Sequence, residues 1–116
     1  MKLIIKLLLT ALAVVVLARI LPGVQVEAYS TAIIVAVVLA LLNVIVKPLL
    51  VLFTLPATIL TLGLFLFVIN AVIILLADKL VDGFGVASFW WALLFSVLLS
   101  VLQSILYSLL EDEKQN

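Results

Sequence analysis

Long apolar runs separated by short polar links dominate the chain. The runs cover about residues 3–21, 28–46, 57–77 and 89–110, and a polar tail follows at residues 111–116. Each run is close to the ~20 residues that an α-helix needs to span the hydrocarbon core of a bilayer. The pattern predicts an all-α integral membrane protein with four transmembrane helices in a single transmembrane domain, residues 1–116.

The second and third runs are joined by an apolar segment that lies between two prolines. Pro48 disfavours helical geometry at the preceding residue and removes a backbone donor, so we expect the second helix to end or kink there. Residues 49–55 are too few to span a membrane, which predicts a bent segment at the inner surface. Thr54 and Pro56 suit the first turn of a new helix, running to about residue 77. Pro48 and Pro56 therefore mark a predicted joint between two helical hairpins.

Composition supports the membrane class and argues against most kinds of catalytic and ligand-binding site. The 116 residues are 69% hydrophobic and 10% charged, with a mean hydropathy of +1.61. Six basic and six acidic residues cancel, so no basic field exists to bind nucleic acid. The sequence has no cysteine and no histidine, which excludes disulfides, thiol nucleophiles and metal ligation by these residues. Asp78 and Asp82 lie in a polar link beside Lys79 and lack a third ligand. We expect no enzymatic activity and no cofactor.

The basic residues predict the orientation. With both termini in the cytoplasm, four lysines lie inside, against two basic residues outside, which agrees with the positive-inside rule. The inner set is Lys2, Lys6, Lys47 and Lys114, and the outer set is Arg19 and Lys79. The basic start also resembles a signal peptide, but Pro22 and Gly23 replace a small-residue cleavage site, so we expect an uncleaved first helix.

The chain matches itself without gaps after a shift of 60 positions, which lays residues 22–43 over residues 82–103. The informative matches are Gly23 with Gly83, Val26 with Val86, Tyr29 with Phe89, and Asn43 with Gln103. We interpret them as two copies of a helical hairpin, about residues 1–55 and 56–110, in one orientation, with a pseudo-twofold axis along the membrane normal. The alternative is two unrelated helices with similar interfacial starts.

The two copies carry matching stripes of small and polar residues. Helical spacing places each stripe on one side of its helix, and such stripes favour helix association in membranes, so both are predicted to face the interior of a bundle. The stripes are Ala32, Ala36, Ala40, Asn43 and Lys47, and Ala92, Ser96, Ser100, Gln103 and Tyr107. Ser104 and Ser108 extend a serine band. The band either lines a wet pore in an oligomer, or its serines bond back to helix carbonyls and pack against a neighbour, and we favour the second interpretation.

The polar residues of the central stretch have structural and binding interpretations. Lys47, at a predicted helix end, is expected to be an interfacial anchor or to contact a lipid headgroup. Asn43 and Asn70 are expected to bond across helices or to satisfy backbone groups freed near Pro48. Helix packing, or a possible polar path, is thus assigned to Asn43, Asn70, Ser96, Ser100 and Gln103.

A distinctive motif runs through residues 42–70: Leu42-Asn43 and Lys47-Pro48-Leu49-Leu50, then Thr54-Leu55-Pro56, Leu60-Thr61-Leu62-Gly63-Leu64-Phe65 and Asn70. It resembles the motif of the four-helix phage-holin-like family, also called the YvlD family of bacterial membrane proteins. The similarity extends over nearly the whole chain, including Pro22-Gly23 and Gly83-Phe84. It implies a protein of the bacterial cytoplasmic membrane, since holins oligomerise there and make lesions, while some similar proteins resemble partners in envelope-stress systems. The family supplies no catalytic residues.

These observations lead to a functional hypothesis. We expect a non-enzymatic, holin-like inner-membrane protein with cytoplasmic termini that acts through oligomerisation or through binding of an envelope-stress partner. Its partners would be the lipid bilayer and a second copy or another membrane protein. The alternative is a small channel or transporter subunit with a polar path between the second and fourth helices.

Overall fold

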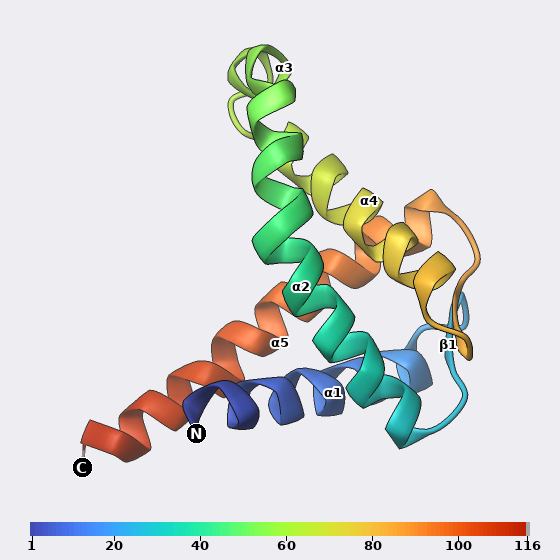
Figure 1. Cartoon of the computed structure of the whole chain (residues 1–116), viewed down its shortest axis with the longest axis vertical. Helices are drawn as coiled ribbons and strands as arrows, with labels where there is room; N and C mark the ends of the chain where they lie inside the picture. Colours follow the sequence, from blue (N-terminus) through green and yellow to red (C-terminus); the bar gives the residue numbers. More distant parts are fainter. Residues whose placement is uncertain (116) are drawn as a thin grey trace.

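The computed structural model describes the backbone of residues 1–115 and the side chains of residues 1–110. Five helices and two short strands follow one another along the chain (Figure 1). They are α1 (Lys2–Ile20), β1 (Val24–Val26), α2 (Tyr29–Phe53), α3 (Leu55–Leu60), α4 (Phe65–Leu80), β2 (Phe84–Val86) and α5 (Phe89–Gln115). The predicted all-α class is confirmed, apart from the strands. The tail's side chains, Lys114 included, lie outside the described part of the chain.

Three of the described helices are long and apolar enough to cross a membrane. They are α1, α2 and the part of α5 from Phe89 to Leu110. Helix α4 has 16 residues, and at 1.5 Å per residue it is only about 24 Å long. The third apolar run therefore contains no single helix of full spanning length.

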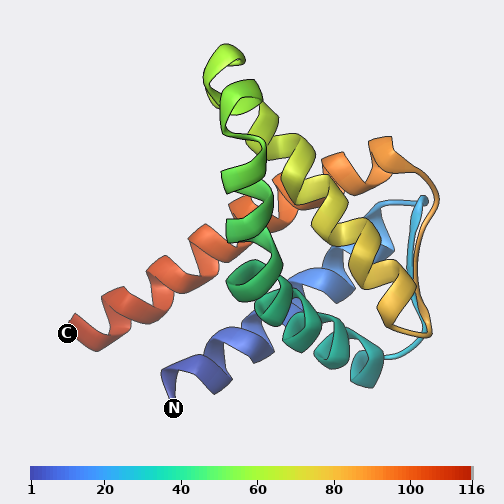
Figure 2. The ribbon, with the colours of Figure 1, turned by 45° about the horizontal axis from the view of Figure 1, so that its top comes forward.

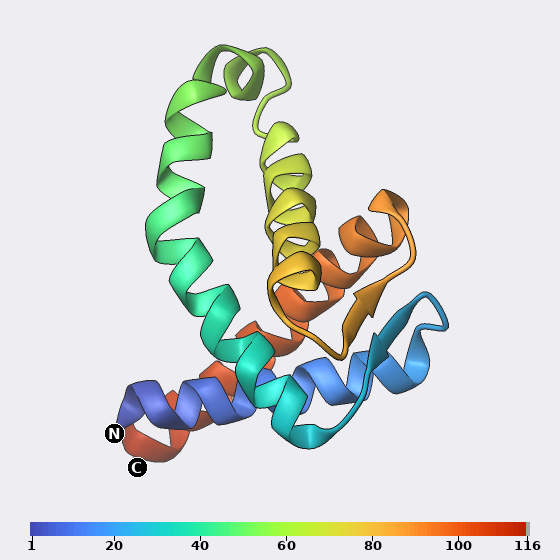
Figure 3. The same ribbon diagram turned by 45° about the vertical axis from the view of Figure 1, so that its right-hand side comes forward.

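The helices form two arms that diverge from the strands. Helices α2 and α4 pack together in one arm, and α1 and α5 pack together in the other. Figures 1 and 2 show α3 at the tip of the first arm and both chain termini at the end of the second. Where the arms meet, α1 also packs on α2, and α4 on α5. Figure 3 shows the strands at the opposite side of the molecule from the termini.

The two polar links pair with each other as a small antiparallel ladder. Val24 lies opposite Val86, Gln25 opposite Gly85, and Val26 opposite Phe84. Beyond the ladder, the N–H of Glu27 donates to the carbonyl of Gly83 and the N–H of Ala87 donates to the carbonyl of Gly23, both at 2.8 Å. The sequence analysis missed these strands because three residues are too few to display an alternating pattern.

Helix α2 does not end at Pro48, the first of the two outcomes predicted there. The helix continues to Phe53, and the N–H and hydroxyl of Thr54 both donate to the carbonyl of Leu50, at 3.0 and 2.6 Å. Proline removes the helical bond to the carbonyl four residues earlier, on Val44. Pro48 and Val44 are both exposed, so the missing bond lies on an accessible side of α2 rather than in the core.

The predicted continuous third helix is wrong, because the chain breaks between α3 and α4. Leu62 and Gly63 have φ values of 56° and 91°, in the left-handed region. The hydroxyl of Thr61 accepts the N–H of Phe65 at 3.0 Å, which satisfies a free donor at the start of α4. A positive φ suits glycine because it has no Cβ. Pro56, as expected, lies in the first turn of a new helix, the short α3.

Alanines are five of the eight hydrophobic core residues with 0% exposure. Ala11, Ala32, Ala71, Ala77 and Ala92 are fully buried, and such residues let helix backbones approach closely. The larger buried side chains include Phe95, whose ring centroid lies 5.9 Å from that of Phe84. The predicted α2 stripe is buried at Ala32 and Ala36, but the buried face is wider and includes Val35, Leu39 and Leu42.

Candidate functional site: a polar cavity between α2, α4 and α5

A cavity of about 130 Å³ lies among α2, α4 and α5. It brings together all six residues to which the sequence analysis assigned packing, path or headgroup roles. Its lining consists of Asn43, Lys47, Asn70, Ser96, Ser100 and Gln103 together with Leu39, Ile73, Ile74 and Leu99. The prolines of the predicted joint, Pro48 and Pro56, do not line it.

The polar and apolar parts of the lining are separated along the helix axes. Asn43 and Lys47 lie one turn apart on α2, beyond Leu39 as seen from the strands, and Asn70 lies beyond Ile73 on α4. The four apolar lining residues are buried. The cavity is therefore mostly apolar at the end near the strands and polar toward the tip of the α2–α4 arm.

Lys47 is the one ionisable group among the lining residues. It is half-buried, as is Asn70, while Asn43 and Ser100 are exposed. No carboxylate lines the cavity, so the local charge of the site is positive when lysine is protonated. The other polar groups are three carboxamides and two hydroxyls, all of which can donate hydrogen bonds.

The serines of α5 fall into two groups. Ser96 is buried, and its hydroxyl donates to the carbonyl of Leu93 at 2.8 Å, the back-bonding geometry favoured in the sequence analysis. Ser100 is exposed where it borders the cavity. Ser104 and Ser108 are also exposed but lie outside the cavity lining.

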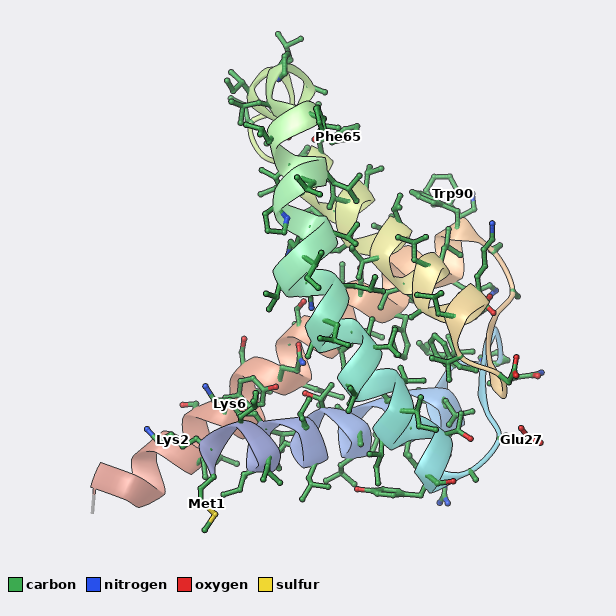
Figure 4. The ribbon with its side chains drawn as sticks, in the orientation of Figure 1. Met1, Lys2, Lys6, Glu27, Phe65 and Trp90 are labelled. Atoms are coloured by element: carbon green, nitrogen blue, oxygen red, sulfur yellow. The ribbon has the colours of Figure 1, made fainter. Side chains whose placement is uncertain are left out.

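A second polar cluster closes the contact between α1 and α5. The hydroxyls of Thr10 and Tyr107 lie 2.7 Å apart, and Gln103 Nε2 donates to Thr10 Oγ1 at 2.9 Å. The Tyr107 hydroxyl also lies 3.3 Å from the backbone carbonyl of Lys6, as donor, and Lys6 Nζ lies 5.2 Å from the ring centroid. Figure 4 shows Lys6 near the start of α1. Sequence reasoning missed Thr10, although it lies 60 positions before Asn70.

The acidic residues of the links form no comparable site. Asp78 Oδ2 accepts the N–H of Val86 at 3.2 Å, which ties the end of α4 to β2. Within the described residues, no group of three acidic, histidine or cysteine side chains is placed to hold a metal ion.

Comparison with known proteins identifies the family. Residues 1–105 match the family model described as "Mycobacterial 4 TMS phage holin, superfamily IV". The chain belongs to this phage-holin family. The matched residues include the whole cavity lining and the Thr10–Gln103 pair of the second cluster.

Two bacterial relatives of this holin-like chain support the assignment. The uncharacterized membrane protein YvlD of Bacillus subtilis (strain 168) is 39% identical over 99 residues, covering 80% of this chain and 82% of YvlD. An uncharacterized protein of Streptomyces coelicolor is 49% identical over 72 residues, covering 59% of this chain and 58% of that protein. No solved structure matches the chain. The predicted resemblance to the YvlD family is thus confirmed.

Proposed function

We propose that this holin-like protein is non-enzymatic and works in the bacterial cytoplasmic (inner) membrane by associating with further copies of itself. The observation that carries the proposal is the exposure of Ser104 and Ser108 on α5, within an apolar helix of spanning length. Hydroxyls gain little from lipid tails, whereas they pack and bond well against another helix. The α5 serine face is therefore the contact surface, either with a second copy or with another membrane protein of the envelope.

The proposal includes four membrane crossings with both termini in the cytoplasm. Helices α1, α2 and α5 are the first, second and fourth crossings. The third crossing is made by α3 and α4 together, with the break between them. Pairing of β1 with β2 supports a common side for the two polar links. The excess of lysine at the termini and near the α2–α3 joint supports a cytoplasmic location for the opposite side.

An internal repeat of two hairpins is also part of the proposal, and the ladder register supports it. When each residue number is replaced by the number 60 positions away in the other copy, the pair Val24–Val86 becomes the pair Val26–Phe84. The pair Gln25–Gly85 is unchanged. The same replacement interconverts the two flanking hydrogen bonds, from Glu27 to Gly83 and from Ala87 to Gly23. A register centred on positions 60 apart is the one expected if the two links are copies of one another.

Cysteine cross-linking tests the self-association directly, because the natural sequence contains no cysteine. Ser104→Cys and Ser108→Cys, each alone, should form disulfide-linked dimers on mild oxidation in isolated membranes. Two copies that pack through this face bring identical positions of α5 together. Dimer formation is measured by gel electrophoresis without reductant.

Position 44 provides the matched control. Val44 is 73% exposed on α2 and is not part of the α5 serine face, so Val44→Cys should remain mostly monomeric at the same expression level. Equal cross-linking of all three variants would reflect random collision and would remove the proposed α5 contact. Cross-linking of none of them, with a different membrane protein captured at residue 104, would instead support the envelope-partner form.

The cavity favours a second candidate function, a channel or transporter subunit with a polar path between α2 and α5. Six polar residues line a space that these two helices share with α4. However, buried leucine and isoleucine side chains line the end near the strands. A path would require that end to open, which makes this the second candidate.

Dye release separates the two candidates. In vesicles of bacterial lipid that contain the purified protein, Ser104→Leu with Ser108→Leu should reduce leakage several-fold, because leucine removes the self-association face. Ser100→Leu, at the cavity, should leak like the unchanged protein and like Val101→Leu, a control at a neighbouring exposed position. Loss of leakage in Ser100→Leu alone would favour the path, and absence of leakage from the unchanged protein would contradict both lesion formation and conduction.

A further inference from the structure

The geometry points to the α2–α4–α5 cavity as a binding site for one phosphate group, held by Lys47 with the carboxamides of Asn43 and Asn70. The group belongs to an anionic lipid or to a free phosphate ion. This binding activity goes beyond the self-association proposed for α5 and uses different residues.

The charge of the lining selects an anion. Lys47 carries the only ionisable group there, and no carboxylate lines the cavity to neutralise it. Hydrogen bonds from an ammonium to phosphate oxygens are charge-assisted, and carboxamide N–H groups add further donors. Calcium or magnesium would need carboxylate or several carbonyl oxygens without a neighbouring ammonium, so a divalent cation fits poorly.

The contact between α1 and α5 contains the residues that correspond, 60 positions away, to Asn43, Lys47 and Asn70. There the corresponding side chains hydrogen-bond to one another. Positions 60 apart correspond as Thr10 with Asn70, Gln103 with Asn43, and Tyr107 with Lys47. The first member of each pair belongs to the α1–α5 cluster, where the three side chains are hydrogen-bonded together. Within residues 1–110, no such bonds join Asn43, Lys47 and Asn70, which instead line the cavity.

This difference distinguishes the two arms. In the α1–α5 arm, the protein fills its own polar contact, and the tyrosine ring occupies the position that corresponds to lysine. In the α2–α4 arm, donors converge on a space of about 130 Å³ that a guest can occupy. No buried polar side-chain atom of the described residues lacks a partner, so the Lys47 and Asn70 donors, which make no bond within residues 1–110, are not sealed inside the protein.

The position of the polar end suits a phosphate that enters from the membrane surface. Lys47 is half-buried and lies in the last part of α2, toward the tip of its arm. A lysine stem of four carbons spans apolar surroundings while its ammonium reaches a polar one. The buried apolar end, at Leu39 and Leu99 among others, limits how deep the phosphate can go.

Binding measurements on the full chain test the site, with one experiment for each of the two sources of phosphate. The first experiment uses lipid nanodiscs of phosphatidylcholine with increasing amounts of phosphatidylglycerol. Native mass spectrometry counts the phosphatidylglycerol molecules that the protein retains. The second experiment uses detergent-solubilised protein and radioactive inorganic phosphate in equilibrium dialysis. The unchanged protein should bind one equivalent of phosphatidylglycerol or of phosphate in at least one experiment. Lys47→Gln should weaken that binding about tenfold or more, since a charge-assisted bond is lost.

Lys79→Gln is the matched control, because it removes the same charge from an exposed residue at the end of α4, outside the cavity lining. It should leave binding unchanged. Asn70→Asp is a second, nearly isosteric variant, which places a carboxylate opposite the phosphate and should also weaken binding about tenfold. It can form a pair with Lys47, so it remains informative if Lys47→Gln does not fold.

Each result decides the matter. Binding of phosphatidylglycerol alone assigns a lipid headgroup, and binding of inorganic phosphate alone assigns the free ion. Absence of binding in both experiments overturns the inference. So does an equal loss in Lys47→Gln and Lys79→Gln, which would indicate surface charge only, or unchanged affinity in Asn70→Asp.

Discussion

Gly23→Ala should lower the free energy of unfolding by about 3 kcal/mol, the largest effect expected from a single methyl group in this protein. A Cβ atom built on Gly23 would overlap the indole ring of Trp91, at the start of α5. The half-buried indole packs against the hydrophobic core, so the added methyl group forces the ring out of this packing. The measurement is loss of helical circular dichroism as sodium dodecyl sulfate replaces a mild detergent.

Gly85→Ala is the matched control for this prediction. Gly85 lies in β2, two residues after Gly83, and a Cβ built there meets nothing within 4 Å. Its φ is not in the left-handed region, so alanine should change stability by less than about 0.5 kcal/mol. Combining Gly23→Ala with Trp91→Leu should recover part of the loss, since the smaller side chain makes room. Equal stability of the two glycine variants would contradict the proposed constraint.

Much of this fold could be predicted because apolar runs are a strong signal. The run at residues 3–21 became α1 at Lys2–Ile20, and the run from about 89 became α5 from Phe89. Local preferences were weaker guides near the prolines. Pro48 was expected to end or kink α2, and the helix continues through this exposed residue to Phe53. The actual break, at Leu62 and Gly63, depends on two left-handed residues that no periodicity reveals.

The cavity could be predicted only in part, for a similar reason. Helical spacing placed Asn43 and Lys47 on one face of α2, and the shift of 60 positions related Asn43 to Gln103. Which faces meet depends on which helices are neighbours. Helix α5 packs against both α1 and α4, so Gln103 borders the cavity and also bonds to Thr10. That double role cannot be read from the spacing of residues within α5.

Tyr107→Phe should lower the free energy of unfolding by about 1–2 kcal/mol, the second effect that we expect to be large. The hydroxyl is the centre of the α1–α5 cluster, 2.7 Å from Thr10 Oγ1 and 3.3 Å from the carbonyl oxygen of Lys6. Thr10 is 4% exposed, so water has little access to the position of the lost partner. Unfolding in mixed detergent micelles, followed by circular dichroism, measures the difference.

Tyr29→Phe is the control, because it removes the same hydroxyl from a residue that is 47% exposed at the start of α2. It should leave stability within about 0.5 kcal/mol of the unchanged protein. Asn43→Leu tests the corresponding position of the other arm, where the carboxamide lines a cavity, and should cost less than Gln103→Leu. If Asn43→Leu and Gln103→Leu cost the same, the two arms do not differ in how their polar residues are satisfied. The contrast between a closed α1–α5 contact and an open α2–α4 cavity would then be lost, together with the reason for placing a phosphate in only one arm.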